Sequence, residues 1–210
     1  MDGRGSPPTP PVPFPNRKDP QMTRVIAGTA GGRRLAVPPG TGTRPTSDRA
    51  REGLFSTWDS LHEIAGARVL DLYGGSGAVG LEALSRGAAH ALLVEADPKA
   101  ARVIRENIAA LRLPGAEART GRAEQIAAGP APADPYDLVF LDPPYAVENA
   151  ELCAILRALA DGGWLAEDAL ITAERATRGG VFPWPEGFEP LRSRRYGEGT
   201  LWYARAVDAG

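Results

Sequence analysis

Residues 138–145 read Leu138-Val139-Phe140-Leu141-Asp142-Pro143-Pro144-Tyr145. The first four residues show no polar alternation, which is typical of a strand buried on both faces in a parallel sheet. The two prolines end this strand, because neither can donate a ladder hydrogen bond and the second restricts the first to an extended conformation. The carboxyl end of the strand therefore presents a carboxylate, a backbone carbonyl and an aromatic ring, at the edge where open α/β sheets bind ligands.

These three groups suit a planar nucleobase that is held by its exocyclic amine. Asp142 and the carbonyl of Pro143 can each accept a hydrogen bond from one N–H, and Tyr145 offers a face on which the ring can stack. The sequence Asp-Pro-Pro-Tyr resembles the signature of amino-methyltransferases, which modify exocyclic nitrogens of adenine, guanine or cytosine. The structural alternative is a rigid turn with a capping Asp, since Asp-Pro and Pro-Pro both mark turns.

A glycine loop follows a second predicted strand at residues 68–73. It reads Gly75-Ser76-Gly77-Ala78-Val79-Gly80, leads into a predicted helix, and matches the dinucleotide-binding fingerprint, with Glu95 ending the next strand. The glycines let the backbone approach a ligand closely, and Glu95 can accept hydrogen bonds from ribose hydroxyls. This pattern fits both nicotinamide dinucleotides and S-adenosylmethionine.

Asp71, just before the loop, favours S-adenosylmethionine. The amino-acid end of that cofactor has an ammonium group, which a carboxylate attracts, whereas a pyrophosphate requires a helix N-terminus. A structural cap of the loop is the alternative role for Asp71. A nicotinamide enzyme also has no use for Asp-Pro-Pro-Tyr, so the two motifs together favour a methyltransferase, with donor and acceptor meeting at one sheet edge.

Composition divides the chain into three segments. Residues 1–21 are rich in proline with little to bury, which predicts a disordered tail, and Met22 is a second candidate start. Residues 22–46 predict a basic β-hairpin and a linker, with strands at 24–27 and 33–37 around a glycine-rich turn. A hairpin of this size must pack on the main domain or on a partner. Residues 47–210 form the predicted α/β domain.

The elements of this domain alternate between strand and helix and end in a hairpin. This order predicts a mostly parallel sheet with an antiparallel strand near its edge. Besides the strands already described, we expect strands at 90–95, 117–120, 169–174, 188–196 and 201–206, and helices at 47–63, 81–86, 97–111, 123–128 and 148–160. On the first helix, Arg49 and Arg51 are expected to lie off the apolar face.

The net charge of −2 conceals an asymmetry. Residues 1–60 carry nine Arg or Lys against five Asp or Glu, a net of +4, which leaves −6 for the rest. The basic residues from 22 to 51 are all arginines, which bind phosphate in a bidentate fork: Arg24, Arg33, Arg34, Arg44, Arg49 and Arg51. On charge alone, these arginines could equally contact RNA or form a solvated charged face.

Several classes of protein are excluded by composition. A single cysteine, Cys153, allows no internal disulfide and no cysteine-rich zinc site, and the two histidines, His62 and His90, give no metal centre. The chain has no apolar run of transmembrane length and no signal-peptide pattern at its start. We therefore expect a cytoplasmic protein without a metal.

Taken together, the motifs resemble the bacterial 16S ribosomal RNA guanine-N2 methyltransferases, over about residues 24–203. The resemblance rests on four stretches: Arg24-Val25-Ile26-Ala27-Gly28, Arg44-Pro45-Thr46-Ser47-Asp48-Arg49-Ala50-Arg51-Glu52, residues 75–84 and residues 142–145. The basic hairpin followed by Arg-Pro-Thr separates this family from DNA adenine methyltransferases. The resemblance implies a seven-stranded Rossmann-like class I methyltransferase sheet of order 3-2-1-4-5-7-6, with strand 7 antiparallel.

The resemblance also implies the ligands and the site. The cofactor would be S-adenosyl-L-methionine, and the partner would be 16S ribosomal RNA in small subunits or late assembly intermediates, bound by a monomer. Asp142, Pro143 and Tyr145 would be catalytic, and the six arginines would bind RNA. The cofactor would contact Asp71, Tyr73, Gly74, Gly75, Ser76, Gly77, Glu95 and Ala123.

One position departs from the family pattern. Arg122 stands where many methyltransferases place a polar residue, often Asp, at the adenine amine of the cofactor, and a guanidinium cannot accept that hydrogen bond. The backbone or Glu124 could supply the contact instead. The alternatives that stay open are an amino-methyltransferase acting on adenine N6 of DNA or another RNA, a nicotinamide-dependent oxidoreductase, and a non-catalytic RNA-binding module.

Overall fold

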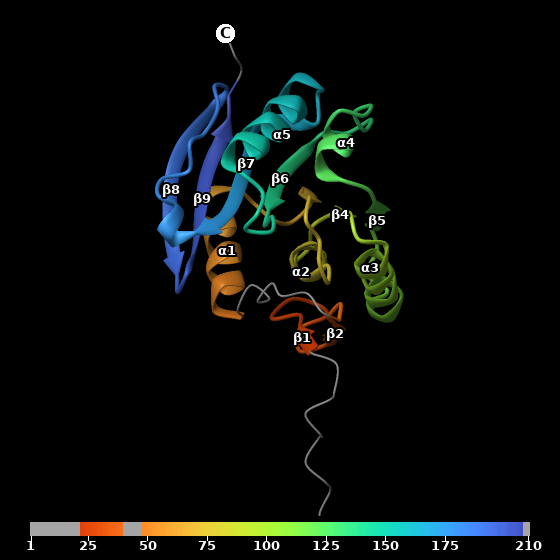
Figure 1. The fold of residues 1–210 in the computed structure, drawn as a ribbon. Helices are drawn as coiled ribbons and strands as arrows, with labels where there is room; N and C mark the ends of the chain where they lie inside the picture. Colours follow the sequence, from red (N-terminus) through yellow and green to blue (C-terminus); the bar gives the residue numbers. More distant parts are fainter. Residues whose placement is uncertain (1–21, 40–47, 208–210) are drawn as a thin grey trace, which may run out of the picture.

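A computed structural model describes residues 22–39 and 48–207 (Figure 1). The predicted tail at 1–21, the linker after residue 39 and Arg44 lie outside the described residues. The centre of the fold is a seven-stranded sheet of order β5-β4-β3-β6-β7-β9-β8. In chain order its strands are β3 (Arg68–Asp71), β4 (His90–Glu95), β5 (Ala116–Thr120), β6 (Tyr136–Leu141), β7 (Leu165–Ala176), β8 (Phe188–Tyr196) and β9 (Gly199–Ala206).

The sheet has the predicted topology. Numbered within the sheet, its strands run 3-2-1-4-5-7-6, the first five are parallel, and β9 is antiparallel to both neighbours. The strand β8 lies at one edge of the sheet, is exposed along most of its length, and contains Pro190 beside a register irregularity. The fold class inferred from the sequence is therefore confirmed.

In the described part of the chain, five α-helices cover the two faces of the sheet (Figure 1). One face packs against α1 (Asp48–Leu61), α2 (Ala78–Ser85) and α3 (Pro98–Leu111), and the other against α4 (Ala123–Ala127) and α5 (Asn149–Asp161). Alternate strand residues serve the two cores, since Val69 faces α1–α3 while Leu70 faces α4 and α5. No helix in the described ranges is long and apolar enough to cross a membrane.

Local sequence explains where the helices begin and how they are anchored. Asp97 caps α3 by accepting a hydrogen bond from the backbone N–H of Lys99 at 2.9 Å, and Pro98 follows at the first helical position. On α1, the indole Nε1 of Trp58 donates to the hydroxyl of Thr172 at 2.9 Å, inside the core. This buried bond ties α1 to the middle of β7.

The N-terminal hairpin, β1 (Met22–Arg24) and β2 (Arg34–Ala36), packs on α2 and α3. The fully buried carboxylate of Glu82 accepts hydrogen bonds from the backbone N–H groups of Ile26 and Ala27, at 2.6 and 2.9 Å, and from Arg86 at 2.8 Å. The predicted strand 24–27 is therefore wrong beyond Arg24, because those N–H groups bond to Glu82 instead of a neighbouring strand.

Two further contacts hold the hairpin down. Gly28 has φ +79° and lies so close to α2 that a Cβ there would overlap the carbonyl oxygen of Ser85, which only glycine permits. The side chain of Asn107 on α3 accepts from the N–H of Ala36 at 2.9 Å and donates to its carbonyl at 3.0 Å. Asn107 also donates to the carbonyl of Ser76 at 2.8 Å, which joins the hairpin to the glycine loop.

We expect Glu82→Ala to lower the free energy of unfolding by about 3 kcal/mol or more, because it leaves the guanidinium and two backbone donors without their buried acceptor. Urea unfolding followed by circular dichroism measures the change. The matched control is Glu106→Ala, which removes an exposed ion pair with Arg102 and should cost less than about 1 kcal/mol. Equal losses in the two variants would show that the buried carboxylate does not anchor the hairpin.

Candidate active site

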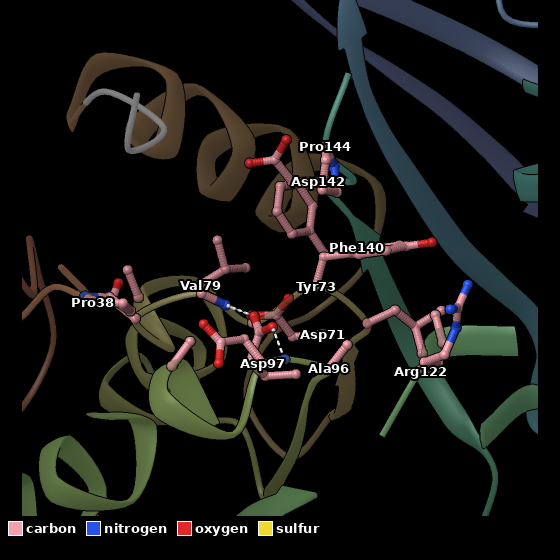
Figure 2. Close-up of a pocket in the computed structure, with 18 of the residues that line it drawn as sticks. Pro38, Asp71, Tyr73, Val79, Ala96, Asp97, Arg122, Phe140, Asp142 and Pro144 are labelled. Carbon is pink, nitrogen blue, oxygen red and sulfur yellow. Dashed lines mark hydrogen bonds between the residues drawn. The ribbon is translucent and has the colours of Figure 1, made fainter. Parts of the chain in front are cut away.

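A cavity of about 410 Å³ opens at the carboxyl edge of β3, β4 and β6. The glycine loop and the ends of β3 and β4 form one part of its wall, and the residues after β6 form another (Figure 2). Pro38 and Thr23 close it from the hairpin, which sequence analysis did not predict. The cavity therefore brings together the two motifs that the sequence placed at this edge.

The glycine loop is shaped by its backbone. Gly75 and Gly77 have φ values of +56° and +81°, which favour glycine. A Cβ on Gly77 would lie 2.9 Å from Cδ2 of Leu93, so the loop packs directly against β4. Gly74, Gly75 and Ser76 line the cavity, whereas Gly77 does not, and contact between this loop and a ligand stays a prediction.

Glu95 holds the ends of two loops together. Its carboxylate accepts hydrogen bonds from the backbone N–H groups of Gly75 and Asp97, each at 2.9 Å. A carboxylate has about four acceptor sites, so each oxygen keeps capacity for a ligand hydroxyl. The position of Glu95 in the cavity wall is that expected for a residue that binds ribose.

Asp71 is an unsatisfied buried acid at the floor of this cavity. Only 1% of its surface is exposed, and Oδ1 has no hydrogen-bond partner in the part of the chain that the structure describes. Burial raises the pKa of Asp71 to about 7, against hydrogen bonds from the backbone N–H groups of Gly80 and Tyr73, and the charge of Glu95 raises it further. A cation in the cavity would restore the charged form, so the site fits an ammonium group.

The Asp-Pro-Pro-Tyr segment divides between two environments. Asp142 and Pro144 line the cavity, while Pro143 is buried behind them. Tyr145 is 65% exposed and borders a second, neighbouring cavity instead of the first. Its ring is thus open on the outside of the mouth, and stacking on a base stays a prediction.

The residues proposed for the cofactor adenine lie at the far wall. Ala123 is buried at the start of α4, while the side chains of Arg122 and Glu124 form an ion pair with each other. Glu124 is one candidate for the adenine contact that Arg122 cannot make. In the structure its carboxylate is paired with Arg122 itself. Both side chains line the cavity and belong to one wall.

Arg44 lies outside the described residues, and the other five arginines divide between the surface and the cavity. Arg34 and Arg49 are exposed, and Arg24 is exposed but paired with Asp48 at 2.9 Å. Arg33 donates through Nη1 to the carbonyl of Leu111 at 3.0 Å and through Nη2 to that of Ala110, so it caps the last turn of α3.

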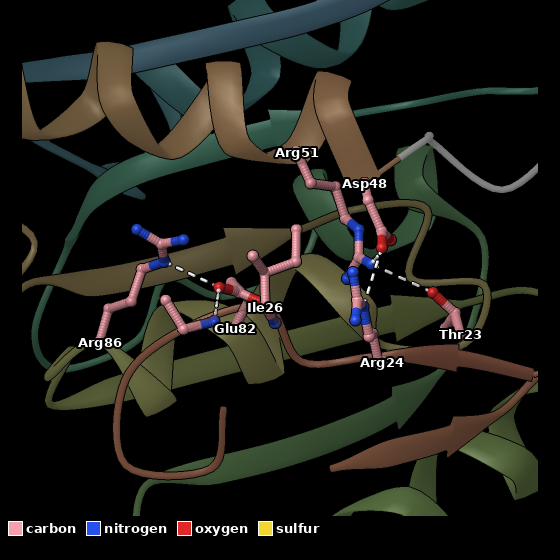
Figure 3. A network of polar contacts seen from close by, with 8 residues as sticks. Thr23, Arg24, Ile26, Asp48, Arg51, Glu82 and Arg86 are labelled. Atoms are coloured by element: carbon pink, nitrogen blue, oxygen red, sulfur yellow. Dashed lines mark hydrogen bonds and ion pairs between the residues drawn. The ribbon is translucent and has the colours of Figure 1, made fainter. Parts of the chain in front are cut away.

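Arg51 corrects the prediction that it lies off the apolar face of α1. It is only 1% exposed and lines the cavity, where Nη2 donates to Asp48 at 2.7 Å and to the hydroxyl of Thr23 at 3.1 Å (Figure 3). Although partial burial acts to raise it, hydrogen bonds from Arg51 and Arg24 hold the pKa of Asp48 below its ordinary value. Asp48 of α1 itself and Thr23 of the hairpin both accept from Nη2, while Nε and Nη1 are buried without a hydrogen-bond partner among the described residues.

Comparison with known proteins identifies the family. The family model described as conserved hypothetical protein 95 matches residues 23–205. The ribosomal RNA small subunit methyltransferase D of Escherichia coli is 37% identical over 184 residues, covering 88% of this chain and 90% of the relative. The chain belongs to the methyltransferase D family. The resemblance inferred from the sequence is thereby confirmed, over almost the predicted range.

Other members of the methyltransferase D family and solved structures agree. The enzyme of that name from Haemophilus influenzae is 36% identical over 162 residues, covering 76% of this chain and 81% of the relative. A solved Escherichia coli structure, proposed to be a methyltransferase, superposes with a TM-score of 0.78 at 35% identity, covering 89% of this chain and 99% of that one. The solved structure of a Haemophilus influenzae protein proposed to be a methylase superposes with a TM-score of 0.72 at 28% identity. The match covers 90% of this chain and 100% of that one.

The raised pKa of Asp71 gives this member of the methyltransferase D family a defined pH dependence. Because the folded protein holds this proton up to about pH 7 and an unfolded Asp releases it near its ordinary value, stability is full at low pH and falls as pH rises toward 7. The loss is up to about 1.4 kcal/mol per pH unit. Asp71→Asn should remove this pH-dependent contribution to the free energy of unfolding. The free energy of unfolding of the variant, relative to that of wild type, should therefore be higher at pH 8 than at pH 5.

Urea unfolding of the ligand-free protein at both pH values measures this difference. Asp161→Asn, at the exposed end of α5, is the control and should leave the pH dependence unchanged. If wild type and Asp71→Asn change in parallel between the two pH values, Asp71 is not the titrating group.

Proposed function

We propose that this protein transfers a methyl group from S-adenosyl-L-methionine to the exocyclic N2 amine of a guanine in 16S ribosomal RNA. The observation that carries the proposal is the single cavity that holds the unpartnered oxygen of Asp71 on one side and Asp142 on the other. The names of the relatives, ribosomal RNA small subunit methyltransferase D, support the substrate.

The cavity residues fit the cofactor group by group. Asp71 would bind the ammonium, the backbone of residues 74–77 would lie along the methionine, and Glu95 would accept hydrogen bonds from the ribose hydroxyls. Tyr73 and Ala123 complete the wall toward the adenine. When bound, S-adenosyl-L-methionine supplies an electrophilic methyl group on a sulfonium.

The chain's own contribution to transfer is positioning and charge stabilisation. The amine of guanine is a poor nucleophile because its lone pair is delocalised into the ring. Hydrogen bonds from its N–H groups to Asp142 and the Pro143 carbonyl would favour a pyramidal nitrogen and offset the developing positive charge. Holding the reacting atoms near attack distance can contribute about 7–11 kcal/mol, and Tyr145 would hold the base by stacking.

The proposed partner is 16S RNA within small subunits or late assembly intermediates, acted on by a monomer in the cytoplasm. The substrate test uses radiolabelled S-adenosyl-L-methionine with small subunits from cells that lack the modification, naked 16S RNA and duplex DNA. Label in N2-methylguanosine from subunits supports the proposal. Label on DNA adenine would overturn the substrate but keep the chemistry, and a protein that binds the cofactor without transferring label would overturn the enzymatic role under these conditions.

We expect Asp142→Ala to lower kcat by at least about 100-fold, because it removes an acceptor that acts on charge developing in the transition state. The affinity for S-adenosyl-L-methionine, measured by calorimetry, should stay close to that of wild type. Asp161→Ala is the control for the loss of one carboxylate. Wild-type kcat in Asp142→Ala would contradict the proposed role of Asp142 in stabilising the transition state.

We expect different roles for two neighbouring arginines of the hairpin, Arg33 and Arg34. Arg34→Gln should weaken RNA binding and lower the slope of log affinity against log salt by about 0.7–0.9, since one phosphate contact is lost. Arg33→Gln should instead reduce stability, because its side chain bonds to the end of α3. Filter binding from 50 to 200 mM salt measures the slope, with Arg102→Gln as control. An unchanged slope in Arg34→Gln would remove this residue from the RNA contact set.

A further inference from the structure

A second cavity, of about 310 Å³, lies beside the first. The two share Val147 as a common wall, so they are neighbours on either side of the segment that follows Asp-Pro-Pro-Tyr. The exposed ring of Tyr145 borders this second cavity, and Arg175 and Arg178, from the end of β7 and the short 3-10 helix after it, bring positive charge. Neither arginine belongs to the site described above.

Arg175 is held rigidly with one nitrogen unsatisfied. Its Nε donates to the side-chain oxygen of Asn149 at 2.9 Å, and Nη2 donates to the carbonyl of Val147 at 2.6 Å. The remaining nitrogen, Nη1, is buried and has no hydrogen-bond partner among the described residues. A buried donor without a partner is destabilising, and a hydrogen bond to a bound oxygen would remove that penalty.

The charge of this cavity favours an anion. Arg178 is exposed and has no ion pair in the described parts of the chain, so its charge is available at the mouth. Glu148 is the one acid in the wall, which leaves two guanidinium groups against one carboxylate. Phe182 closes one side and stacks edge-on against Trp184, with ring centroids 4.7 Å apart.

We propose that this second cavity binds a backbone phosphate of the RNA directly next to the target nucleotide. The inference rests on the proposed function, because the amine of the target must reach Asp142 in the first cavity. The sugar and phosphate of a base stacked on Tyr145 would then lie toward the second cavity, whose wall contains Tyr145, Arg175 and Arg178. A fixed guanidinium suits a phosphate, since the planar fork recognises two oxygens at once.

This site complements the hairpin. In Figure 1 the hairpin β1–β2 lies on one side of α2 and β7 on the other. RNA that contacts both would be held on two sides of the extruded base. The second cavity would therefore hold the flanking backbone and add to the affinity for the RNA, without contacting the reacting amine.

The experiment compares wild type with Arg178→Gln, Arg175→Gln and the control Arg157→Gln, which changes an exposed residue of α5. Each variant is assayed for kcat and KM on unmodified small subunits, for the salt dependence of binding, and for cofactor affinity. Arg178→Gln should raise KM about threefold and lower the salt slope by about 0.7. Arg175→Gln should raise KM about tenfold, as loss of a charged hydrogen bond predicts. The kcat and the cofactor affinity should not change.

Wild-type activity separates the two ideas. If wild type places no label on guanine N2, the proposed function fails regardless of the arginines. If wild type does so but Arg178→Gln and Arg175→Gln keep the wild-type KM and salt slope, the phosphate site is refuted and the function stands. A fall in kcat with an unchanged salt slope also refutes it, because Arg175 would then only shape the loop after Tyr145.

Discussion

The parallel pairing of β3 with β6 is the constraint on which the site depends. In this register Asp71 lies opposite Phe140, so Asp142 extends two residues beyond it on the adjacent strand. Two chain segments about 70 residues apart in sequence thereby end at one point of the sheet edge. The buried acid and the Asp-Pro-Pro-Tyr segment consequently share one cavity without any loop having to move.

The features that the sequence predicted well are those encoded locally. Apolar runs marked β3, β4 and β6 as buried strands, and a polar residue at or after the end of each predicted strand marked Asp71, Glu95 and Asp142. The strand order came from the family resemblance, because periodicity alone does not say which strands are neighbours. The predicted positions of these acids around one cavity are confirmed, whereas their contacts with ligands stay predictions.

The features that the sequence did not predict depend on contacts between distant elements. Helical periodicity placed Arg51 outside, but its side chain is buried, and Nη2 donates to Thr23 of the hairpin as well as to Asp48 of the same helix. The first hairpin strand was extended too far because Glu82, more than 50 residues away, bonds to its backbone. Because Glu82 stands within an apolar helix, the sequence indicates that it needs a buried partner. The sequence does not indicate that this partner is the backbone of the hairpin.

The exposed edge of β8 has a consequence for behaviour in concentrated solution. An open strand offers unpaired backbone groups to any other strand, and this is a common route to aggregation. Pro190 removes one donor, the adjacent irregularity bends the strand, and Arg192, Arg194 and Arg195 place repelling charges along it. The edge therefore discourages pairing between copies and helps to keep the protein from forming fibrils.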